Sequence, residues 1–390
     1  MHIDVNNAFL SWSAVKLLYD GYERDIRKIE AVIGGDETKR HGIVLAKSPL
    51  AKKKGVKTAE TIRDAKRKCN NLQIFSPNHD LYQKESKKLF ELISHYTPDI
   101  EILSVDECFI DYTKVRNLYG DPIKFAHKLK NEIKTKLGIT VNIGIANNKL
   151  CAKMGSDFEK PDKVHTLFMN EVKEKMYPLP IEELYGVGKS SSKILRELNI
   201  NTISDLANAD YNILYKYFKN QTKRLIASAQ GIDDGVVVVH KKEVEGISSS
   251  ITTSHNLNSL EEIYEYIYPL VENVCAQLRS KNKYANQVGV MLKDKNFKVT
   301  SHQKRLDNAT SNTDTIYYNA KELVKELWNK EGIRLVGVSL GKLTTKLTHQ
   351  ISMFEDIKEV ENNNELDKVV DNLKKIYGNN IISKASNLKR

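Results

Sequence analysis

Two adjacent acids, Asp106 and Glu107, interrupt the stretch SVDECFID, which otherwise has the pattern of a β-strand. Neighbouring residues on a straight strand point to opposite faces of a sheet, so the two side chains can share a site only at a bend. The tip of a hairpin between EILSV and CFIDY would provide one. A third acid, Asp4, lies on a short strand before a predicted helix. Three acids at one sheet edge repel one another unless cations lie between them, and Mg²⁺ takes carboxylate oxygens.

Such a site would support phosphoryl transfer. Two metal ions about 3.5–4 Å apart activate an attacking oxygen and stabilise a leaving one. The pair Asp106 and Glu107 also has a simpler interpretation, as solvated loop acids without a ligand. The basic residues and the glycine turn elsewhere in the chain favour the metal site over this alternative.

Four lysines have positions that suit a polyphosphate substrate. Lys52 follows a strand in KSPLAKKKG, and Lys160 precedes a proline in SDFEKP. Lys149 and Lys153 are four residues apart, which places them on one face of a predicted helix. Ammonium groups near the acids would neutralise a triphosphate. Each lysine taken alone also fits an ordinary surface position.

The segment YGVGK, from Tyr185 to Lys189, has the pattern of a tight turn between two helices. Gly186 and Gly188, with Val187 between them, let the backbone approach a phosphate closely. The next helix offers unpaired N–H groups at its N-terminus. This helix–hairpin–helix signature predicts sequence-independent contact with a nucleic-acid backbone. A plain turn between helices is the alternative.

The composition is consistent with a polyanionic partner. The chain has 390 residues, which is too long for one compact core and suggests two to four domains. Its formal net charge is +11 and its isoelectric point about 9.1. A charge of this size most often indicates nucleic-acid binding, although a soluble protein that is merely rich in lysine would share it.

Strands and helices must position these residues. HIDVNNAFLSW begins as a strand and continues as a helix, and IEAVIGG and GIVLAK are expected strands joined by a charged turn. DLYQKESKKLFELISHY has helical spacing, a further helix is expected to start at Asp121-Pro122, and ITVNIGIA alternates as a strand. The order strand, helix, strand, strand, helix, strand predicts a split βαβ sheet in which the Asp4 strand lies beside the VDE hairpin.

The pattern changes from about residue 178. Helices are expected around YGVGK, and GIDDGVVVVHKKEVEGISSS has the composition of a linker. A second βαββαβ pattern follows, in which Ser259 and Glu262 form a capping box before one helix and Gly332 ends the next. Beyond about Thr345 the sequence is polar, which predicts a tail.

The chain has the features of a cytoplasmic protein. No run of about 18 apolar residues predicts a membrane span, and the N-terminus lacks a signal-peptide pattern. The cysteines are far apart without a CxxC motif, so we expect reduced thiols and no zinc site. They are Cys69, Cys108, Cys151 and Cys275.

Several motifs in one order resemble the Y-family DNA polymerases, the translesion enzymes of DinB and UmuC type. They extend over nearly the whole chain, and together they are specific although each alone is weak. These motifs are HIDVNNAFLSW, AKSPLAKKKGV, SVDECFID, GIANNKLCAKMGSDFEKP, LYGVGK and GIRLVGVSLGKL.

The resemblance implies an α+β multidomain, right-hand architecture. It comprises a ferredoxin-like palm, small fingers, a helical thumb with the helix–hairpin–helix turn, and a βαββαβ little finger. The implied boundaries are palm 1–10 and 76–165, fingers 11–75, thumb 166–235, linker 236–245, little finger 246–345 and tail 346–390. The four domains and the tail use up the chain, so no proofreading domain is expected.

The resemblance also implies roles for single residues. Asp4, Asp106 and Glu107 would hold two Mg²⁺ ions, with the Val5 carbonyl as a backbone ligand, while a primer 3′-hydroxyl attacks the α-phosphate of a deoxynucleotide. Phe9, five residues after Asp4, matches the steric gate that excludes a ribose 2′-OH; a core aromatic residue is its alternative. The implied contact residues are Lys52 and Lys160 for the triphosphate, and Lys149, Lys153, Gly186, Val187, Gly188 and Lys189 for DNA.

Two positions depart from the family pattern. Many relatives have Asp where this chain has Asn6, and the frequent Arg of the fingers is Lys52 here. Lysine offers a point charge rather than a bidentate fork, so the contact with the triphosphate is expected to differ. Relatives also carry several residues before the first strand, so a longer natural N-terminus than Met1-His2 is an open alternative.

The segment QISMF resembles the short clamp-binding peptide of bacterial polymerases, and a chance match is the alternative. A disordered tail could place it in a groove of the sliding clamp, which would raise the effective concentration at the primer end. The contact residues would be Gln350, Ser352, Met353 and Phe354.

The resemblance implies a monomeric, cytoplasmic enzyme of DNA repair, damage tolerance and mutagenesis. Its partners would be primer–template DNA and deoxynucleoside triphosphates, and its fidelity would be low because small fingers press little on the nascent base pair. Two alternatives belong to other classes. A binding protein that recruits factors would not need Asp106, and a Mg²⁺-dependent nuclease would leave Phe9 and the triphosphate lysines unexplained.

Overall fold

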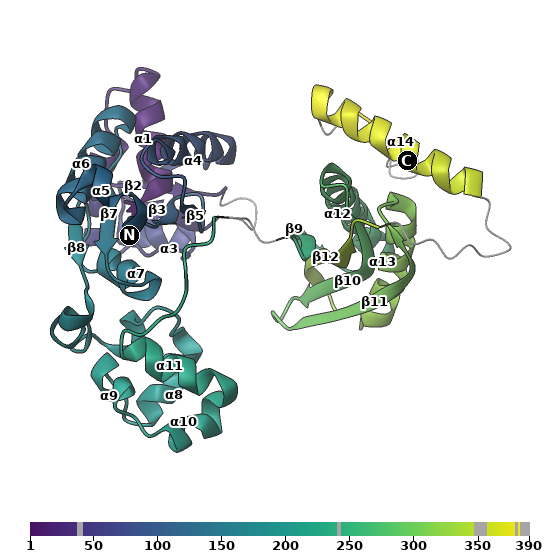
Figure 1. The fold of residues 1–390 in the computed structure, drawn as a ribbon. Coiled ribbons are helices and arrows are strands. Elements are labelled where there is room, and N and C mark those ends of the chain that lie inside the picture. Colours follow the sequence, from purple (N-terminus) through teal and green to yellow (C-terminus); the bar gives the residue numbers. More distant parts are fainter. Residues whose placement is uncertain (37–41, 240–242, 347–356, 379–380, 383–390) are drawn as a thin grey trace. The chain divides into compact units, whose positions relative to one another are not determined.

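The computed structural model describes residues 1–36, 42–239, 243–346, 357–378 and 381–382 (Figure 1). The chain separates into two compact units, an N-terminal unit that ends near residue 241 and a C-terminal unit that follows it. Among the helices of these residues, none is long and apolar enough to cross a membrane.

The N-terminal unit is built on a five-stranded sheet with the order β5-β6-β1-β7-β8. β1 lies at its centre, antiparallel to β6 and β7, whereas β7 and β8 are parallel. The prediction that the Asp4 strand lies beside the VDE hairpin is confirmed, because Asp4 is paired with Glu107. The strands are β1 (His2–Val5), β5 (Ile100–Ile102), β6 (Glu107–Ile110), β7 (Val141–Ile145) and β8 (Val164–Thr166).

Helices cover this sheet and bury its apolar residues. α6 and α7 pack on β7, and α4 packs beside α6. Asp121 caps α6 by accepting hydrogen bonds from Ile123 and Lys124, as the Asp-Pro start predicted. Leu89 of α4 and Leu129 of α6 lie in the core beneath the central strands. The helices are α4 (His79–Ser94), η2 (Thr113–Val115), α5 (Arg116–Tyr119), α6 (Pro122–Leu137) and α7 (Lys149–Asp157).

A smaller three-stranded sheet with the order β3-β2-β4 accompanies the first one. The predicted strands in IEAVIGG and GIVLAK are confirmed, and they pair antiparallel. The third strand, β4, was not predicted; it is short and pairs parallel with β2. The elements of this region are α1 (Ala8–Tyr19), η1 (Ile26–Lys28), β2 (Ala31–Gly34), β3 (Val44–Lys47), α2 (Pro49–Lys53), α3 (Ile62–Lys68) and β4 (Gln73–Phe75).

Residues 169–229 are helical, as predicted for the region around YGVGK. The element before that turn is a single 3₁₀ turn rather than the expected α-helix, because Pro180 stands immediately before it and Leu184 returns to an extended backbone. The elements are η3 (Met169–Glu171), the π-helical turn η4 (Val172–Met176), η5 (Ile181–Glu183), α8 (Lys189–Glu197), α9 (Ile203–Ala207), α10 (Tyr211–Phe218), η6 (Lys219–Gln221) and α11 (Thr222–Ala229).

The C-terminal unit has the predicted βαββαβ order and forms a four-stranded sheet, β11-β10-β12-β9. All three strand pairs are antiparallel. α12 and α13 bury one face of the sheet; α13 ends at Leu327, five residues before Gly332. The elements are β9 (Gly246–Leu257), α12 (Leu260–Ser280), β10 (Tyr284–Asp294), β11 (Val299–Thr310), α13 (Thr313–Leu327) and β12 (Ile333–Thr344).

The predicted tail beyond Thr345 contains an element that the sequence did not predict, the long helix α14 (Ile357–Tyr377; Figure 1, yellow). It contacts α12 through charged pairs: Arg279 binds Asp367 at 3.1 Å and Asp371 at 2.6 Å. Polarity favoured a tail, but a polar helix is stabilised when its charges find partners on a neighbouring element. The peptide Gln350–Phe354 lies outside the described residues.

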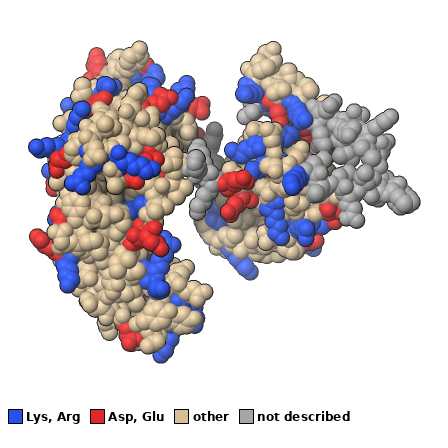
Figure 2. Space-filling view, in the orientation of Figure 1, with Lys and Arg blue, Asp and Glu red and all other residues tan. Residues whose placement is uncertain are grey.

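On the visible face, Lys and Arg are scattered over both units with Asp and Glu between them (Figure 2).

All four cysteines are buried as thiols, and burial raises the pKa of Cys108 and Cys275 to about 12. These thiols are therefore protonated near neutral pH and unreactive.

Candidate active site

The centre of the site lies where β1 and β6 run side by side. Asp4 on β1 and Glu107, the first residue of β6, are directly opposite each other in antiparallel register. Opposite residues of an antiparallel pair point to the same face of the sheet, so these two carboxylates are neighbours. Asp4 is only 7% exposed.

Asp106 lies in the turn immediately before β6, as predicted for a bend. Its backbone carbonyl accepts a hydrogen bond from the N–H of Val5 at 3.1 Å, which brings the turn to the end of β1. Its side chain accepts a hydrogen bond from Ser104 at 2.6 Å. The three acids thus come to the same end of two strands. Within the described part of the chain, however, no three acid, His or Cys side chains converge closely enough to form a ready metal cage.

The environments of the paired acids differ. Burial raises the pKa of Asp4, and the Lys160 ammonium opposes that increase. The interaction with His2, followed by the ammonium of Lys153, lowers the pKa of Glu107 to about 2, although burial acts in the opposite direction. Glu107 is therefore ionised throughout the neutral range, as a cation ligand must be.

Two lysines contact these acids directly. Lys153 Nζ lies 2.7 Å from Glu107 Oε2, and Lys160 Nζ lies 2.7 Å from Asp4 Oδ2. Lys160 also binds Asp157 at 2.8 Å. Burial acts to lower the pKa of Lys160, but the two carboxylates outweigh it and raise that pKa. Two of the four lysines that the sequence placed in this site thus contact two of its three acids.

His2 belongs to the site and was missed by sequence reasoning. Its side chain is fully buried, its Nδ1 lies 2.8 Å from Ser156 Oγ, and its Nε2 lies 3.4 Å from Glu107 Oε2. A signal was present, because His2 is two residues before Asp4 and so shares its face of the strand. Its position between α7 and Glu107 orients that carboxylate.

Asn6, the departure from the family pattern, has a structural role. Its amide donates to Asn142 Oδ1 at 3.0 Å, and its carbonyl oxygen accepts from the N–H of Asp162 at 2.8 Å. An amide can make both bonds, whereas an ionised Asp has no donor for Asn142. Asn6 thereby fixes the loop that carries Lys160.

Phe9 lies in the first turn of α1, close to the Asp4 strand. Its ring stacks on Tyr82 with centroids 4.5 Å apart and an interplanar angle of 11°. His79 contacts the same ring edge-on, at a centroid distance of 6.2 Å. Phe9 is only partly buried, so one part of a rigidly held ring remains accessible. This position allows the steric-gate role without requiring it.

Lys149 does not contact the three acids. It shares a face of α7 with Lys153, as predicted, but its ammonium binds Glu101 at 2.6 Å and lies 5.0 Å from the centroid of the Phe109 ring. These contacts join α7 to β5 and β6. The geometry therefore gives Lys149 a place in the sheet packing, beside the acid cluster.

Lys52 lies on α2, away from the sheet that carries the acids, and is exposed. Ser48 caps this helix by accepting from the N–H of Ala51, as expected for a Ser before a helix that starts with proline. Sequence reasoning missed Lys47, which forms a basic pair with Lys52: burial and then the Lys52 charge lower the pKa of Lys47. The motif AKSPLAK contained this signal.

The YGVGK turn has the open backbone that its glycines predicted. Gly186 adopts φ +94°, which L side chains rarely adopt, and no atom lies within 4 Å of the Cβ position at Gly186 or Gly188. Gly188 is the N-cap of α8, which begins at Lys189, while Val187 is buried in the core. The turn therefore presents backbone N–H groups without a side chain in front of them.

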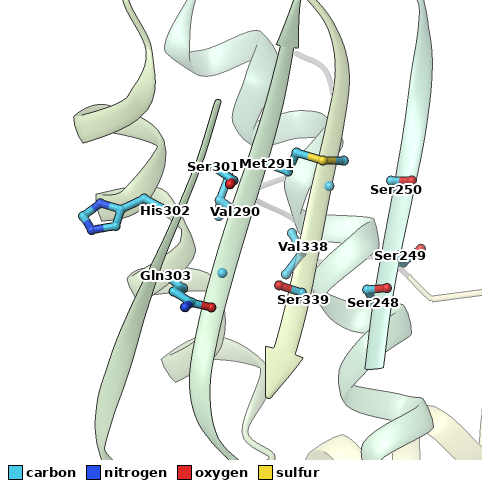
Figure 3. Close-up of a pocket in the computed structure, with 12 residues that line it drawn as sticks. Ser248, Ser249, Ser250, Val290, Met291, Ser301, His302, Gln303, Val338 and Ser339 are labelled. Carbon is cyan, nitrogen blue, oxygen red and sulfur yellow. The ribbon is translucent and has the colours of Figure 1, made fainter. Parts of the chain in front are cut away.

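The C-terminal unit has a separate open surface. The sheet of this unit carries a cavity of about 680 Å³ that is lined mainly by small and hydroxylated residues, together with the larger Met291, His302 and Gln303 (Figure 3). Sequence reasoning did not select them, because serines on alternate strand positions resemble any solvated face. The lining includes Ser248, Ser249, Ser250, Gly289, Ser301, His302, Gln303, Gly337 and Ser339.

Three family models match the chain: the impB/mucB/samB family over residues 3–157, the family's helix–hairpin–helix motif over residues 170–200, and the family's C-terminal domain over residues 244–353.

Curated relatives agree with the family models along the whole chain. A protein named DNA polymerase IV from Clostridium acetobutylicum is 44% identical over 385 residues, which is 98% of this chain and 96% of the relative. Another of that name, from Acetivibrio thermocellus, is 37% identical over 97% of this chain and 94% of the relative.

A solved structure supports the same fold. A Y-family DNA polymerase chimera of Dbh and Dpo4 superimposes with a TM-score of 0.75 at 24% identity, over 88% of this chain and 99% of that one. The chain belongs to the impB/mucB/samB family of Y-family translesion polymerases, and it is a DNA-directed DNA polymerase.

Proposed function

We propose that this polymerase adds deoxynucleotides to a primer 3′-hydroxyl on damaged templates by two-metal nucleotidyl transfer. The observation that carries the proposal is the pairing of Asp4 with Glu107, each with a lysine ammonium 2.7 Å away. Carboxylates alone would bind a metal ion. Carboxylates with lysine ammoniums beside them can bind a metal ion together with a polyphosphate.

The acid side chains fit hard divalent cations. The side chains of Asp4, Asp106 and Glu107 supply carboxylate oxygens, which are the preferred ligands of Mg²⁺. The hydrogen bond from the Val5 N–H to the Asp106 carbonyl keeps the Val5 carbonyl at the same end of the strands. Two Mg²⁺ ions, when bound there, supply Lewis acidity to the attacking hydroxyl and charge neutralisation to the triphosphate.

The other residues of the site bind and position the substrates. We assign Lys160 and Lys52 to the triphosphate, with Lys47 added beside Lys52. The Phe9 ring, held by Tyr82, excludes a ribose 2′-OH by contact. Lys153 orients Glu107 and offsets charge near the primer end. Lysine ammoniums are suited to this role because they stabilise negative charge that develops on phosphate oxygens.

DNA is held by the turn and by two further surfaces. In this proposal Gly186 to Lys189 contact the backbone of the duplex, and Lys149 and Lys153 add positive charge beside it. The sheet of the C-terminal unit lets a nucleic-acid backbone approach closely at its glycines and serines, beside the longer side chains of Met291 and Gln303 (Figure 3). Since these contacts are mostly to phosphates, DNA binding is expected to weaken steeply with salt.

The domain boundaries and the cellular role remain part of the proposal. We assign the palm to 1–10 and 76–165, the fingers to 11–75, the thumb to 166–235, the linker to 236–245 and the little finger to 246–345. The enzyme acts as a cytoplasmic monomer in DNA repair, with low fidelity and without proofreading. Its clamp contact is Gln350–Phe354, in the segment between β12 and α14.

Primer extension tests this function. Full-length protein, primer–template DNA, each deoxynucleotide and Mg²⁺ should give extension, and Asp106→Ala should abolish it while DNA binding persists. A suitable control is Asp111→Ala, since Asp111 lies at the other end of β6 and accepts only from the N–H of Thr113. Extension by Asp106→Ala at the wild-type rate would contradict the proposed metal site.

The assay also separates the alternative functions. Shortening of the primer rather than extension, with loss in Asp106→Ala, would indicate a nuclease. DNA binding without extension by either protein would indicate a binding role. A template with an abasic site or a bulky adduct then tests the translesion assignment, which requires extension past the lesion.

A further inference from the structure

Helix α10 exposes an unusual number of large side chains. Leu214 and Phe218 anchor it in the core of the helical region, where they are 0% and 8% exposed. Four other large residues of this eight-residue helix are 42–54% exposed, and three of them are tyrosines. They are Tyr211, Ile213, Tyr215 and Tyr217.

Two of these tyrosines form an ordered pair. Tyr211 and Tyr215 are one helical turn apart, and their rings stack with centroids 5.8 Å apart and an interplanar angle of 24°. The ammonium of Lys219 lies 5.8 Å from the centroid of the Tyr215 ring. Neighbouring rings that already lie nearly parallel present flat π-faces at little cost in side-chain entropy.

The surroundings of the pair are positively charged. No Asp or Glu occurs between Asp210 and Asp233, whereas four basic residues do. All four are exposed, on α10, η6 and the first turns of α11: Lys216, Lys219, Lys223 and Arg224. Asp210, the N-cap residue of α10, is the nearest acid in the sequence, so basic residues predominate along this stretch, and their charge favours a polyanion.

We propose that Tyr211, Tyr215 and Lys219 form a stacking platform for unpaired DNA, separate from the duplex contact at YGVGK. Aromatic rings stack on bases of any sequence, and nearby cations follow the phosphates, which is how proteins hold single strands without base readout. The proposal rests on the polymerase function only for the source of the strand, which is the single-stranded template beyond the primer terminus.

Binding of a labelled single strand tests the platform directly. The full chain is titrated into fluorescent oligo(dT) of about 16 nucleotides, and anisotropy is followed at two salt concentrations. Tyr211→Ala with Tyr215→Ala should weaken binding about tenfold, because two stacking faces are lost. Tyr211→Phe with Tyr215→Phe keeps both rings and should bind within about twofold of the wild type.

Matched variants distinguish stacking from general surface effects. Tyr217→Ala removes an equally exposed tyrosine of the same helix outside the stacked pair, and it should leave affinity unchanged. Tyr211→Leu with Tyr215→Leu keeps apolar area without a π-face, and it should behave like the double alanine variant. Thermal unfolding of each variant checks that the helical region is intact. If the double alanine variant is unfolded, the double leucine variant replaces it in the binding test.

The outcomes separate this proposal from the polymerase assignment. Wild-type affinity of the double alanine and leucine variants for oligo(dT) would overturn the platform. An equal loss of affinity for blunt duplex DNA would overturn the assignment to unpaired DNA. The double alanine and double leucine variants should still extend a primer on a template with a one-nucleotide overhang. If the wild type does not extend the primer in this assay, the polymerase function is contradicted, whereas the platform is judged by binding of oligo(dT).

Discussion

Lys160 Nζ lies 2.7 Å from Asp4 Oδ2, which joins the loop after α7 to the first strand across 156 residues of sequence. The same loop is held from its other side by the hydrogen bond from the Asp162 N–H to Asn6. The ammonium is therefore positioned by two independent contacts beside an acid of the proposed metal site. The Asp4 side chain is 11% exposed and the Lys160 side chain 36%, so the pair is strengthened by burial of the acid more than of the lysine.

Replacement of Lys160 by alanine should impair nucleotide binding more than turnover. The variant Lys160→Ala loses an ammonium assigned to the triphosphate, so KM for the deoxynucleotide should rise about tenfold with a smaller change in kcat. Lys163→Ala is the control, because Lys163 is exposed and pairs at 3.4 Å with Glu159 at the surface. Steady-state primer extension measures both constants, and an unchanged KM in Lys160→Ala would refute the assignment.

Replacement of Phe9 by alanine should relax sugar selection. Removing the ring makes room for a 2′-OH, so the preference for deoxynucleotides over ribonucleotides should fall at least tenfold. Tyr82→Phe retains the ring that stacks on Phe9 and loses only the hydroxyl contact with Ser13 at 2.9 Å, so its selectivity should stay near the wild type. Single-nucleotide incorporation with matched dNTP and rNTP provides the ratio; equal selectivity in Phe9→Ala would make Phe9 a core aromatic residue only.

The ion pairs of Asp162 should make stability depend on acid pH. Burial acts to raise the pKa of this carboxyl, but hydrogen bonds from Lys130 and Lys134, both 2.8 Å, outweigh it and lower the pKa. A carboxyl with a lowered folded-state pKa stabilises the protein above its unfolded-state pKa, and this contribution is lost as pH falls through the folded value.

Asp162→Asn tests this contribution and keeps the backbone, because Asn tolerates the left-handed conformation (φ +63°) that Asp162 adopts. We expect a loss of about 1 kcal/mol in unfolding free energy at pH 7, after allowance for solvent screening. Urea unfolding at pH 7, 5 and 3 should show the difference from the wild type shrinking below the ordinary pKa of Asp near 3.9. A difference that stays constant over this range would contradict the prediction.

Arg279 should hold α14 on the C-terminal unit. Its side chain is 8% exposed and binds Asp367 and Asp371 of α14 as well as the backbone carbonyl of Ser311. Arg279→Met leaves these acids without their cation, so we expect a loss of about 3 kcal/mol in unfolding free energy. Hydrogen exchange should also become faster in α14.

A milder variant provides the comparison for that result. Lys374→Met removes the 2.9 Å pair between Lys374 and Glu272, which is the other ion pair between α14 and α12 among the described side chains. The loss should stay below about 1 kcal/mol, because Lys374 binds a single acid, whereas Arg279 binds two acids and a backbone carbonyl. Equal effects of the two variants would show that Arg279 has no special role in docking the helix.

Much of the site was accessible from the sequence because strand registers and motifs are local. The order of strands and helices predicted that the Asp4 strand lies beside the VDE hairpin, and the spacing of Lys149 and Lys153 placed both on one helix face. The two glycines of YGVGK predicted an open turn, because only a residue without Cβ adopts φ +94° readily. The helix face and the turn depend on neighbours within a few residues, whereas the strand pairing depends on the order of the elements along the chain.

The errors and omissions concern contacts between distant residues. α14 was missed because its polarity suggested a tail, and its ion pairs with Arg279 and Glu272 of another helix explain why it docks. His2 and Lys47 were missed because neither is unusual in its own segment. Conversely, Lys149 was grouped with Lys153, but pairing with Glu101 of β5 separates their roles.

By itself the sequence determined the elements, the order of the motifs and the membership of a polymerase family, since these depend on local pattern and on residue types. Only the tertiary structure decided which cation meets which acid: Lys153 with Glu107, Lys160 with Asp4, and Arg279 with α14. Ion pairs act over a few ångströms between residues far apart in the chain, and no local spacing encodes that distance.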